Sequence, residues 1–205
     1  MRKEIAIFTS KEMQNNSYLI INDNECVVVD PSFAADEINE YITKNNLKLL
    51  GVLLTHGHYD HFATANFLLE KYNTSLYVYE KEKDVILQHN LNDLFNVENF
   101  VLPSNIKFFS GKTLELGKIK LDIVYTPGHT IGGICIFWEK YVFTGDTIFI
   151  DSVGRMDLPT GNPRQLLQSI QQIKKFDKSL RVLTGHNETN VTLEELLKRN
   201  KYVNF

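Results

Sequence analysis

The sequence predicts an α/β protein, in the α+β sense, whose mostly antiparallel sheets are covered by helices. Apolar runs of strand length come in groups, with helical patterns between them, rather than in strict alternation with helices. Two strand-rich halves share a similar plan. Apolar residues make up 43% and charged residues 23% of the chain, as in average globular domains. A length of 205 residues suits one domain spanning 1–205.

The first half is expected to hold three short strands, a helix, a strand, a second helix and a further strand. Asp30 and Pro31 end the third strand, and apolar residues at helical spacing mark the first helix. After the last strand, the stretch 80–99 is interpreted as helical or irregular. The expected ranges, in order, are 5–8, 18–21, 27–29, 35–45, 49–54, 62–72 and 75–79.

The second half repeats the pattern with four strands, an irregular stretch, a helix, a strand and a final helix. The irregular stretch, 145–162, is rich in Gly, Asp and Pro. Pro163 suits an early position of the helix that follows it. The expected ranges, in order, are 106–108, 120–125, 133–138, 141–143, 164–174, 181–184 and 193–200.

The run THGHYDH at residues 55–61 is the strongest chemical signal in the chain. It places His56, His58, Asp60 and His61 within six residues, directly after an apolar strand. A turn at that point can bring several side chains together. Imidazole nitrogen and carboxylate oxygen suit zinc and similar metals. The run therefore predicts a metal site, whereas a solvated His-rich loop is the alternative without function.

Three other turns place a possible ligand directly after a glycine at the end of a strand. These turns are TPGHT with His129, TGDT with Asp146 and TGHN with His186. Each is weak evidence alone, because a single His or Asp at a strand end is more often a cap or a hydrogen-bonded core residue. Together with the motif, they hold five of the six histidines in the chain. Only His89 lies elsewhere, and it is interpreted as a surface residue.

Seven possible ligands exceed the needs of one tetrahedral zinc ion, so two divalent ions that share one bridging carboxylate are expected. Such a pair supplies hydroxide at neutral pH and polarises a carbonyl, which favours hydrolysis. Zinc fits the donors best, and iron or manganese are alternatives.

The motifs make the chain resemble the metallo-β-lactamase superfamily, and within it the glyoxalase II-like (hydroxyacylglutathione hydrolase-like) branch. The resemblance covers nearly the whole chain and rests on VVVDPS, THGHYDH, TPGHTIGG, FTGDTIF with GRMDLP, and LTGHN. It implies a four-layer αβ/βα sandwich, in which two mixed β-sheets pack face to face with helices outside. The implied site lies at one edge of the sheets.

The resemblance also implies roles for individual residues. Asp146 would bridge the two metals, and Asp60 would also orient a bridging hydroxide toward a thioester such as S-lactoylglutathione or a related acyl-thiol. Arg155 in GRMD would bind the carboxylate end of the substrate, with an ion pair to Asp157 as the structural alternative. The first metal would be held by His56, His58 and His129, and the second by Asp60, His61 and His186.

Two departures from the glutathione-using enzymes bear on the thiol carrier. Those enzymes carry a C-terminal helical extension, whereas this sequence ends about twenty residues after His186. Many of them have a Tyr two residues after the last ligand, where Glu188 stands here. A substrate built on a thiol other than glutathione is therefore kept as an alternative.

Other functions within the superfamily remain as alternatives. Persulfide dioxygenases share a GR-x-D segment and use a single iron, and hydrolysis of lactones or other esters needs the same site. Zinc-dependent β-lactamases commonly have Cys where Asp146 stands, and a nuclease would need a basic surface run that the sequence lacks.

Charge and hydropathy restrict the partners and the location of the protein. With 22 basic and 25 acidic residues, the chain offers no stripe for nucleic acid. It has neither a signal-peptide core nor an apolar run of membrane-spanning length, so a cytoplasmic protein without membrane or nucleic-acid partners is expected. Cys26 and Cys135 lie in apolar runs and are interpreted as buried thiols. The oligomeric state is not predicted.

Overall fold

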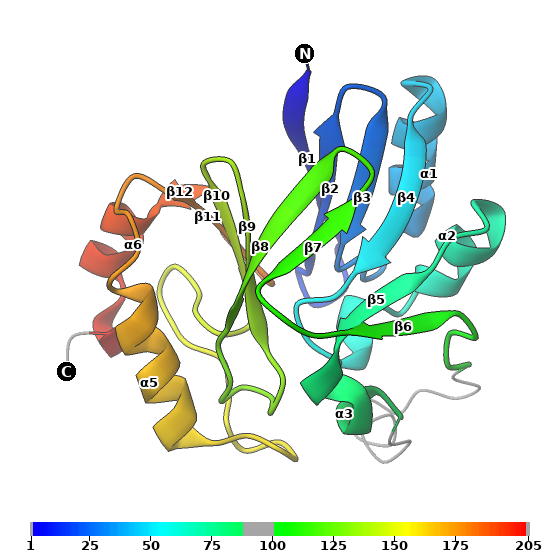
Figure 1. Cartoon of the computed structure of the whole chain (residues 1–205). Coiled ribbons are helices and arrows are strands. Elements are labelled where there is room, and N and C mark those ends of the chain that lie inside the picture. Colours follow the sequence, from blue (N-terminus) through cyan, green and yellow to red (C-terminus); the bar gives the residue numbers. More distant parts are fainter. Residues whose placement is uncertain (1, 88–100, 204–205) are drawn as a thin grey trace.

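Two six-stranded sheets pack face to face, and helices cover the outer face of each (Figure 1). The structure is a computed structural model that describes residues 2–87 and 101–203. The first sheet has the order β1-β2-β3-β4-β5-β6, and the second has the order β12-β11-β10-β9-β8-β7. The four layers are those of the predicted αβ/βα sandwich, which is thereby confirmed.

The strands of the first sheet are β1 (Lys3–Thr9), β2 (Asn16–Asn22), β3 (Glu25–Val29), β4 (Lys48–Leu53), β5 (Leu76–Tyr79) and β6 (Ile106–Phe109). Those of the second are β7 (Thr113–Leu116), β8 (Ile119–Tyr125), β9 (Ile134–Trp138), β10 (Tyr141–Gly145), β11 (Arg181–Thr184) and β12 (Val191–Thr192). The α-helices are α1 (Ala35–Lys44), α2 (Ala65–Lys71), α3 (Lys83–Leu87), α5 (Pro163–Ile173) and α6 (Leu193–Arg199), and short 3₁₀ helices are η1 (Tyr59–His61), η2 (Glu80–Glu82) and η3 (Lys201–Val203).

Three hydrophobic clusters fill the three spaces between the four layers. Alternate residues of β2 point to opposite faces, as in any strand. Leu19 packs with α1 and α2 on the outer side, whereas Ile20 packs between the sheets. The third cluster joins the outer face of the second sheet to α5 and α6, for example through Val182 and Ile170. Burial on both faces explains why these strands read as continuous apolar runs.

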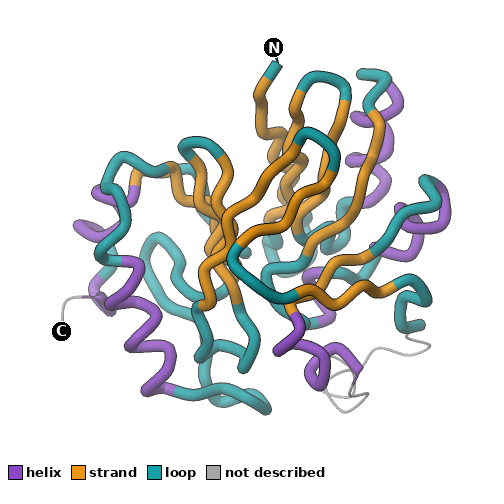
Figure 2. The backbone as a smooth tube through the Cα atoms, viewed as in Figure 1, coloured by secondary structure: helices purple, strands orange, loops and turns teal. Residues whose placement is uncertain are grey.

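Both sheets are mixed. Antiparallel pairing dominates in β1-β2-β3 and in β7-β8-β9-β10. Parallel pairing joins β3 to β4, β4 to β5, β5 to β6, and β10 to β11. Helices α1, α2 and α5 make the crossovers between three of these parallel pairs, as parallel strands require (Figure 2). This strand arrangement brings the carboxyl ends of β4, β8, β10 and β11 to the same edge of the two sheets.

The structure differs from the sequence-based elements at the start of one helix and in two added strands. The helix expected over 62–72 begins only at Ala65, because residues 59–61 form the 3₁₀ helix of the motif. Two strands, β7 and β12, were not expected, and each pairs only with one neighbour at a sheet edge. The stretch expected to be helical or irregular over 80–99 contains η2 and α3, while the remainder, including His89, lies outside the described residues.

Helix α5 shows how the sequence ends the irregular stretch that precedes it. The side chain of Asn162 accepts a hydrogen bond from the backbone N–H of Gln165, and Pro163 occupies the first turn. Both features are favourable at a helix N-terminus. The predicted role of Pro163 is therefore confirmed.

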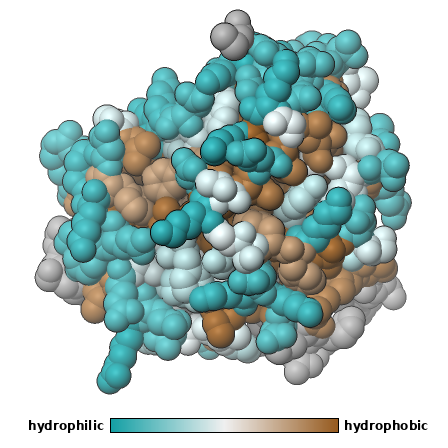
Figure 3. Space-filling model, in the orientation of Figure 1, coloured by the Kyte–Doolittle hydropathy of each residue, from teal (hydrophilic) through white to brown (hydrophobic). Residues whose placement is uncertain are grey.

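The surface and the buried thiols agree with the composition. On the face drawn in Figure 3, hydrophobic residues lie in separate groups among hydrophilic ones. No helix among the described residues is long and apolar enough to span a membrane. Cys26 and Cys135 are free and buried, as expected, and burial raises the pKa of each thiol to about 12.

Candidate metal centre

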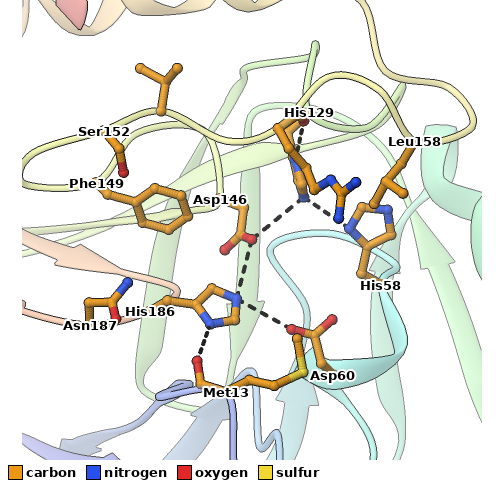
Figure 4. A pocket seen from close by; sticks show the side chains of 12 residues that line it. Met13, His58, Asp60, His129, Asp146, Phe149, Ser152, Leu158, His186 and Asn187 are labelled. Atoms are coloured by element: carbon orange, nitrogen blue, oxygen red, sulfur yellow. Dashed lines mark hydrogen bonds and ion pairs between the residues drawn. The ribbon is translucent and has the colours of Figure 1, made fainter. Parts of the chain in front are cut away.

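All seven side chains predicted to bind metal meet at one edge of the two sheets. The motif that follows β4 supplies four of them, and the turns after β8, β10 and β11 supply one each. All seven side chains are buried or nearly so, with His186 the most exposed at 13%. Figure 4 shows five of them from close by, with His58, Asp60, His129, Asp146 and His186 pointing toward a common centre.

The first group consists of His56, His58 and His129, whose ligand atoms lie within 4.8 Å of one another. Nε2 of His56 is 3.1 Å from Nδ1 of His58, and Nε2 of His129 is 2.9 Å from that same atom. Nitrogen ligands that surround a tetrahedral zinc ion at 2.0–2.1 Å are about 3.3 Å apart. The three nitrogens therefore have the spacing of a metal site.

The second group consists of Asp60, His61 and His186, and it meets the same distance criterion. Nε2 of His186 lies 3.3 Å from Oδ2 of Asp60, and Nε2 of His61 lies 3.6 Å from the same oxygen. Asp146 lies between the two groups. Its Oδ1 is 3.3 Å from His61, and its Oδ2 is 3.3 Å from His186 and 3.6 Å from His129.

Two buried atoms of the cluster, Nε2 of His61 and Oδ1 of Asp146, lie 3.3 Å apart, but neither makes a hydrogen bond of good geometry among the described residues. A buried polar atom without a partner is costly in free energy unless another group satisfies it. Both atoms point into the cluster and are of types that bind zinc. The donor set therefore fits metal ions, although the ligand role of each residue remains a prediction.

Three histidines are oriented through their other ring nitrogen. Nδ1 of His129 donates to the carbonyl oxygen of Arg155 at 2.8 Å, and Nδ1 of His186 donates to that of Met13 at 2.9 Å. Nδ1 of His61 lies 3.0 Å from Oδ2 of Asp30. Such partners fix the ring orientation and leave Nε2 as the ligand atom.

The pKa values of the histidines and carboxylates separate the two groups. Burial lowers the pKa of His56 and His129, and lowers that of His58 to about 3, so these rings are neutral. Burial also opposes charge on His61, but Asp146, Asp60 and Asp30 outweigh it and raise the His61 pKa. The same attraction holds the pKa of Asp146 well below its usual value despite burial. The first group is thus a set of neutral imidazoles, and the second is a network of opposite charges.

A pocket of about 310 Å³ opens onto this cluster. Apart from the predicted ligands, apolar side chains such as Met13, Phe149 and Leu158 form much of its lining. Arg155 also lines it, and its guanidinium forms an ion pair with Asp157 at 2.8 Å. The ion pair with Asp157, which was the structural alternative to a substrate-binding role for Arg155, is therefore observed. The pocket is of a size that suits a small substrate.

Three buried residues that the motifs did not single out as site residues support the ligands. Asp30 accepts hydrogen bonds from the backbone N–H and the hydroxyl of Thr55, besides its contact with His61. Asn15 donates its amide to Oδ2 of Asp60 at 2.9 Å. Glu82 contacts the loops of both His58 and His129. Asp30 lies in the VVVDPS run that carries the resemblance, but no site role was predicted for it, and no pattern near Asn15 or Glu82 indicated one.

Comparisons with known proteins agree with this geometry. The family model described as "Metallo-beta-lactamase superfamily" matches residues 11–186. A probable metallo-hydrolase of Bacillus subtilis, YqgX, is 32% identical over 190 residues, which are 89% of this chain and 90% of that protein. A hydroxyacylglutathione hydrolase of Francisella philomiragia is 32% identical over 183 residues, which are 88% of this chain but 66% of that protein.

Among solved structures, the BLEG-1 B3 metallo-beta-lactamase superposes with a TM-score of 0.87. The match covers 98% of this chain and all of that one at 24% identity, and thus shows a shared fold. The family model covers most of the chain, and the YqgX match spans nearly the full length of both proteins. The chain therefore belongs to the metallo-beta-lactamase superfamily.

Proposed function

We propose that this metal-dependent hydrolase cleaves thioesters, such as S-lactoylglutathione or a related acyl-thiol. The proposed cofactor is a pair of divalent metal ions, with zinc as the first choice. The observation that carries the proposal is the pair of overlapping donor groups with Asp146 between them. When bound, two such ions supply hydroxide at neutral pH and polarise a carbonyl oxygen. Three histidines would hold one ion, and Asp60, His61 and His186 the other.

The residues around the cluster have distinct tasks in this proposal. Asp60 is held by the amide of Asn15 and by its approach to His186, so that its carboxylate can orient the attacking water. Asp146 reaches both groups with its two oxygens. Met13, Phe149 and Leu158 are apolar residues of the pocket lining, so an acyl group in the pocket can lie against them and be shielded from water.

The thioester class is supported by a relative. The similar protein of Francisella philomiragia is named a hydroxyacylglutathione hydrolase. Because the match covers 66% of that protein, the thiol carrier of this chain is left open between glutathione and another thiol. We propose a cytoplasmic enzyme whose partner is the small-molecule substrate alone.

The test is metal analysis of the purified protein combined with hydrolysis assays on S-lactoylglutathione, a simpler acyl-thioester, a lactone and an oxygen ester. We expect close to two metal ions per chain and turnover of at least one thioester. Asp60→Ala should lower that turnover by more than about a hundredfold, because it removes both a ligand and the group that orients water. The exposed Asp122→Asn is the control and should be fully active.

Two results would contradict this proposal. One iron per chain with oxygen consumption on a persulfide would assign the chain to dioxygenase chemistry. Turnover of lactones or esters with no activity on any thioester would retain the hydrolase but overturn the substrate class.

A further inference from the structure

Glu82 is a fully buried carboxylate outside the predicted ligand set. It is the last residue of η2, which follows β5, and its side chain belongs to a residue that is only 1% exposed. No cation pairs with it among the residues that the structure describes. Burying a charge without a partner cation is costly, and burial raises the pKa of Glu82. The hydrogen bonds that it accepts must offset this cost.

Those hydrogen bonds lead to two separate loops of the candidate metal centre. Oε2 accepts from the backbone N–H of Gly57 at 2.9 Å. Oε1 accepts from the hydroxyl of Thr130 at 2.5 Å and from the backbone N–H of Gly132 at 2.6 Å. One carboxylate therefore joins the loop after β4, in the first sheet, to the loop after β8, in the second.

Each of these contacts lies next to a predicted ligand of the first group. Gly57 stands between His56 and His58, and Thr130 directly follows His129. The nitrogens of His58 and His129 are 2.9 Å apart although the residues are 71 positions apart in the chain. Glu82 is thus placed to hold the two loops at the separation that brings these imidazoles together.

The close packing around Glu82 depends on two glycines. A Cβ added to Gly57 would lie 2.9 Å from Oε2 of Glu82, and one added to Gly132 would lie 2.4 Å from the backbone nitrogen of Glu82. Any side chain at Gly132 would push the loop of His129 away from η2. The two glycines let the backbone of both loops approach closely enough for the carboxylate of Glu82 to accept these hydrogen bonds.

We propose that Glu82 is a positioning residue that fixes the loops of His58 and His129 relative to each other, and thereby sets the metal affinity of the site formed by His56, His58 and His129. This inference rests on the proposed metal centre. It assigns Glu82 no contact with metal or substrate. Its effect should be confined to the first group, because the residues that donate to Glu82 adjoin His56, His58 and His129 and do not adjoin Asp60, His61 or His186.

The test is a titration of the metal-free full chain with Zn²⁺ in competition with a chromophoric chelator, which measures the number and affinity of the sites. In Glu82→Gln, an amide group replaces one oxygen and faces an N–H or O–H donor. We expect one of the two sites to weaken about 10–100-fold, as for other groups that orient ligands, and the other to change by less than about twofold. Thr130→Val, which removes one of the three donors, should weaken the same site less.

Ile42→Ala is the control for general destabilisation. Ile42 is buried in α1, on an element other than the two loops, and belongs to the outer cluster of the first sheet. It should lower the melting temperature without altering either affinity. If Glu82→Gln fails to fold, Thr130→Val decides the question alone.

Unchanged affinities in the variants, or equal weakening of both sites, would overturn the positioning role. If the wild-type chain itself binds only one ion, the two-metal proposal fails while this inference is still tested. In that case the single affinity must fall in Glu82→Gln and stay unchanged in Ile42→Ala.

Discussion

The two halves of the sandwich support their share of the candidate metal centre in different ways. In the first half, four predicted ligands lie in one motif, and side chains from other loops hold them: Asp30 orients His61, and Asn15 bonds Asp60. In the second half, each ligand comes from its own turn. There, backbone carbonyls orient His129 and His186, and glycines let the turns approach one another.

This difference separates two means of holding a ligand. A supporting side chain can be exchanged for a similar one, and the effect depends on the lost hydrogen bond. A glycine that allows close approach cannot be replaced without moving the backbone. The second half should therefore tolerate substitution less, even where no polar group is lost.

The largest effect is expected for Gly185→Ala. A Cβ at this position would lie 2.1 Å from Oδ1 of Asp146 and 2.9 Å from Cε1 of His61. We expect the free energy of unfolding to fall by about 1–3 kcal/mol, as for other overpacked sites. Metal content, measured by elemental analysis, should fall although every ligand is retained.

Gly111→Ala is the matched control for this substitution. Gly111 has a φ of 101°, but no atom lies within 4 Å of an added Cβ. It should lower stability through backbone strain alone and leave metal content unchanged. Normal metal content in Gly185→Ala would contradict the prediction. It would show that the backbone of the turn can move to accommodate the added Cβ without displacing the ligands.

A smaller effect is expected for Asp30→Asn in the first half. The amide keeps the size of the side chain and leaves Oδ1 to accept from the N–H of Thr55, but its NH₂ group replaces Oδ2, the oxygen that contacts both His61 and the hydroxyl of Thr55. We expect metal affinity and turnover to fall about 10–100-fold, with the fold intact by circular dichroism. Asp122→Asn, on the exposed side of β8, should behave as wild type. A larger loss of metal binding in Asp30→Asn than in Gly185→Ala would reverse the expected order, in which the second half tolerates substitution less than the first.

The smallest effect is expected for Arg155→Gln. Its side chain is 61% exposed, so its ion pair with Asp157 should add little to stability, and the melting temperature should not change. If Arg155 attracts the anionic end of a substrate, kcat/KM should fall about fivefold for an anionic thioester and not for a neutral one. Arg164→Gln, exposed at the start of α5, is the control. Equal loss on both substrates would remove Arg155 from substrate recognition.

Much of the fold could be predicted because its strands are buried on both faces and appear as apolar runs, as in β2 and β3. The two strands that were not expected lack this signal. Thr113–Leu116 alternates polar and apolar residues with only Leu116 buried, and Val191–Thr192 is too short for any pattern. Periodicity cannot identify a two-residue strand that is set by its neighbour β11.

The site divides in the same way. Each predicted ligand could be found because a strand, a small-residue turn and a donor side chain follow one another locally. Glu82 and Asn15 have no such local sign. Their roles depend on distances of 25–50 residues along the chain, between Glu82 and its partners, and of 45 residues between Asn15 and Asp60. Only the packing of the sheets reveals these partners.

The hydrogen bonds that hold the turn of His186 affect the order in which the chain folds. His186 is held by Met13, while Asn16 and Tyr18 bond the carbonyl of Thr184, across separations of 166–173 residues. Contacts between such distant segments form slowly, because a long loop must close first. During synthesis on the ribosome, the first half emerges with four donors of the centre before the second can complete it. The edge that carries the candidate metal centre is therefore among the last parts to assemble, and metal uptake should report the end of folding.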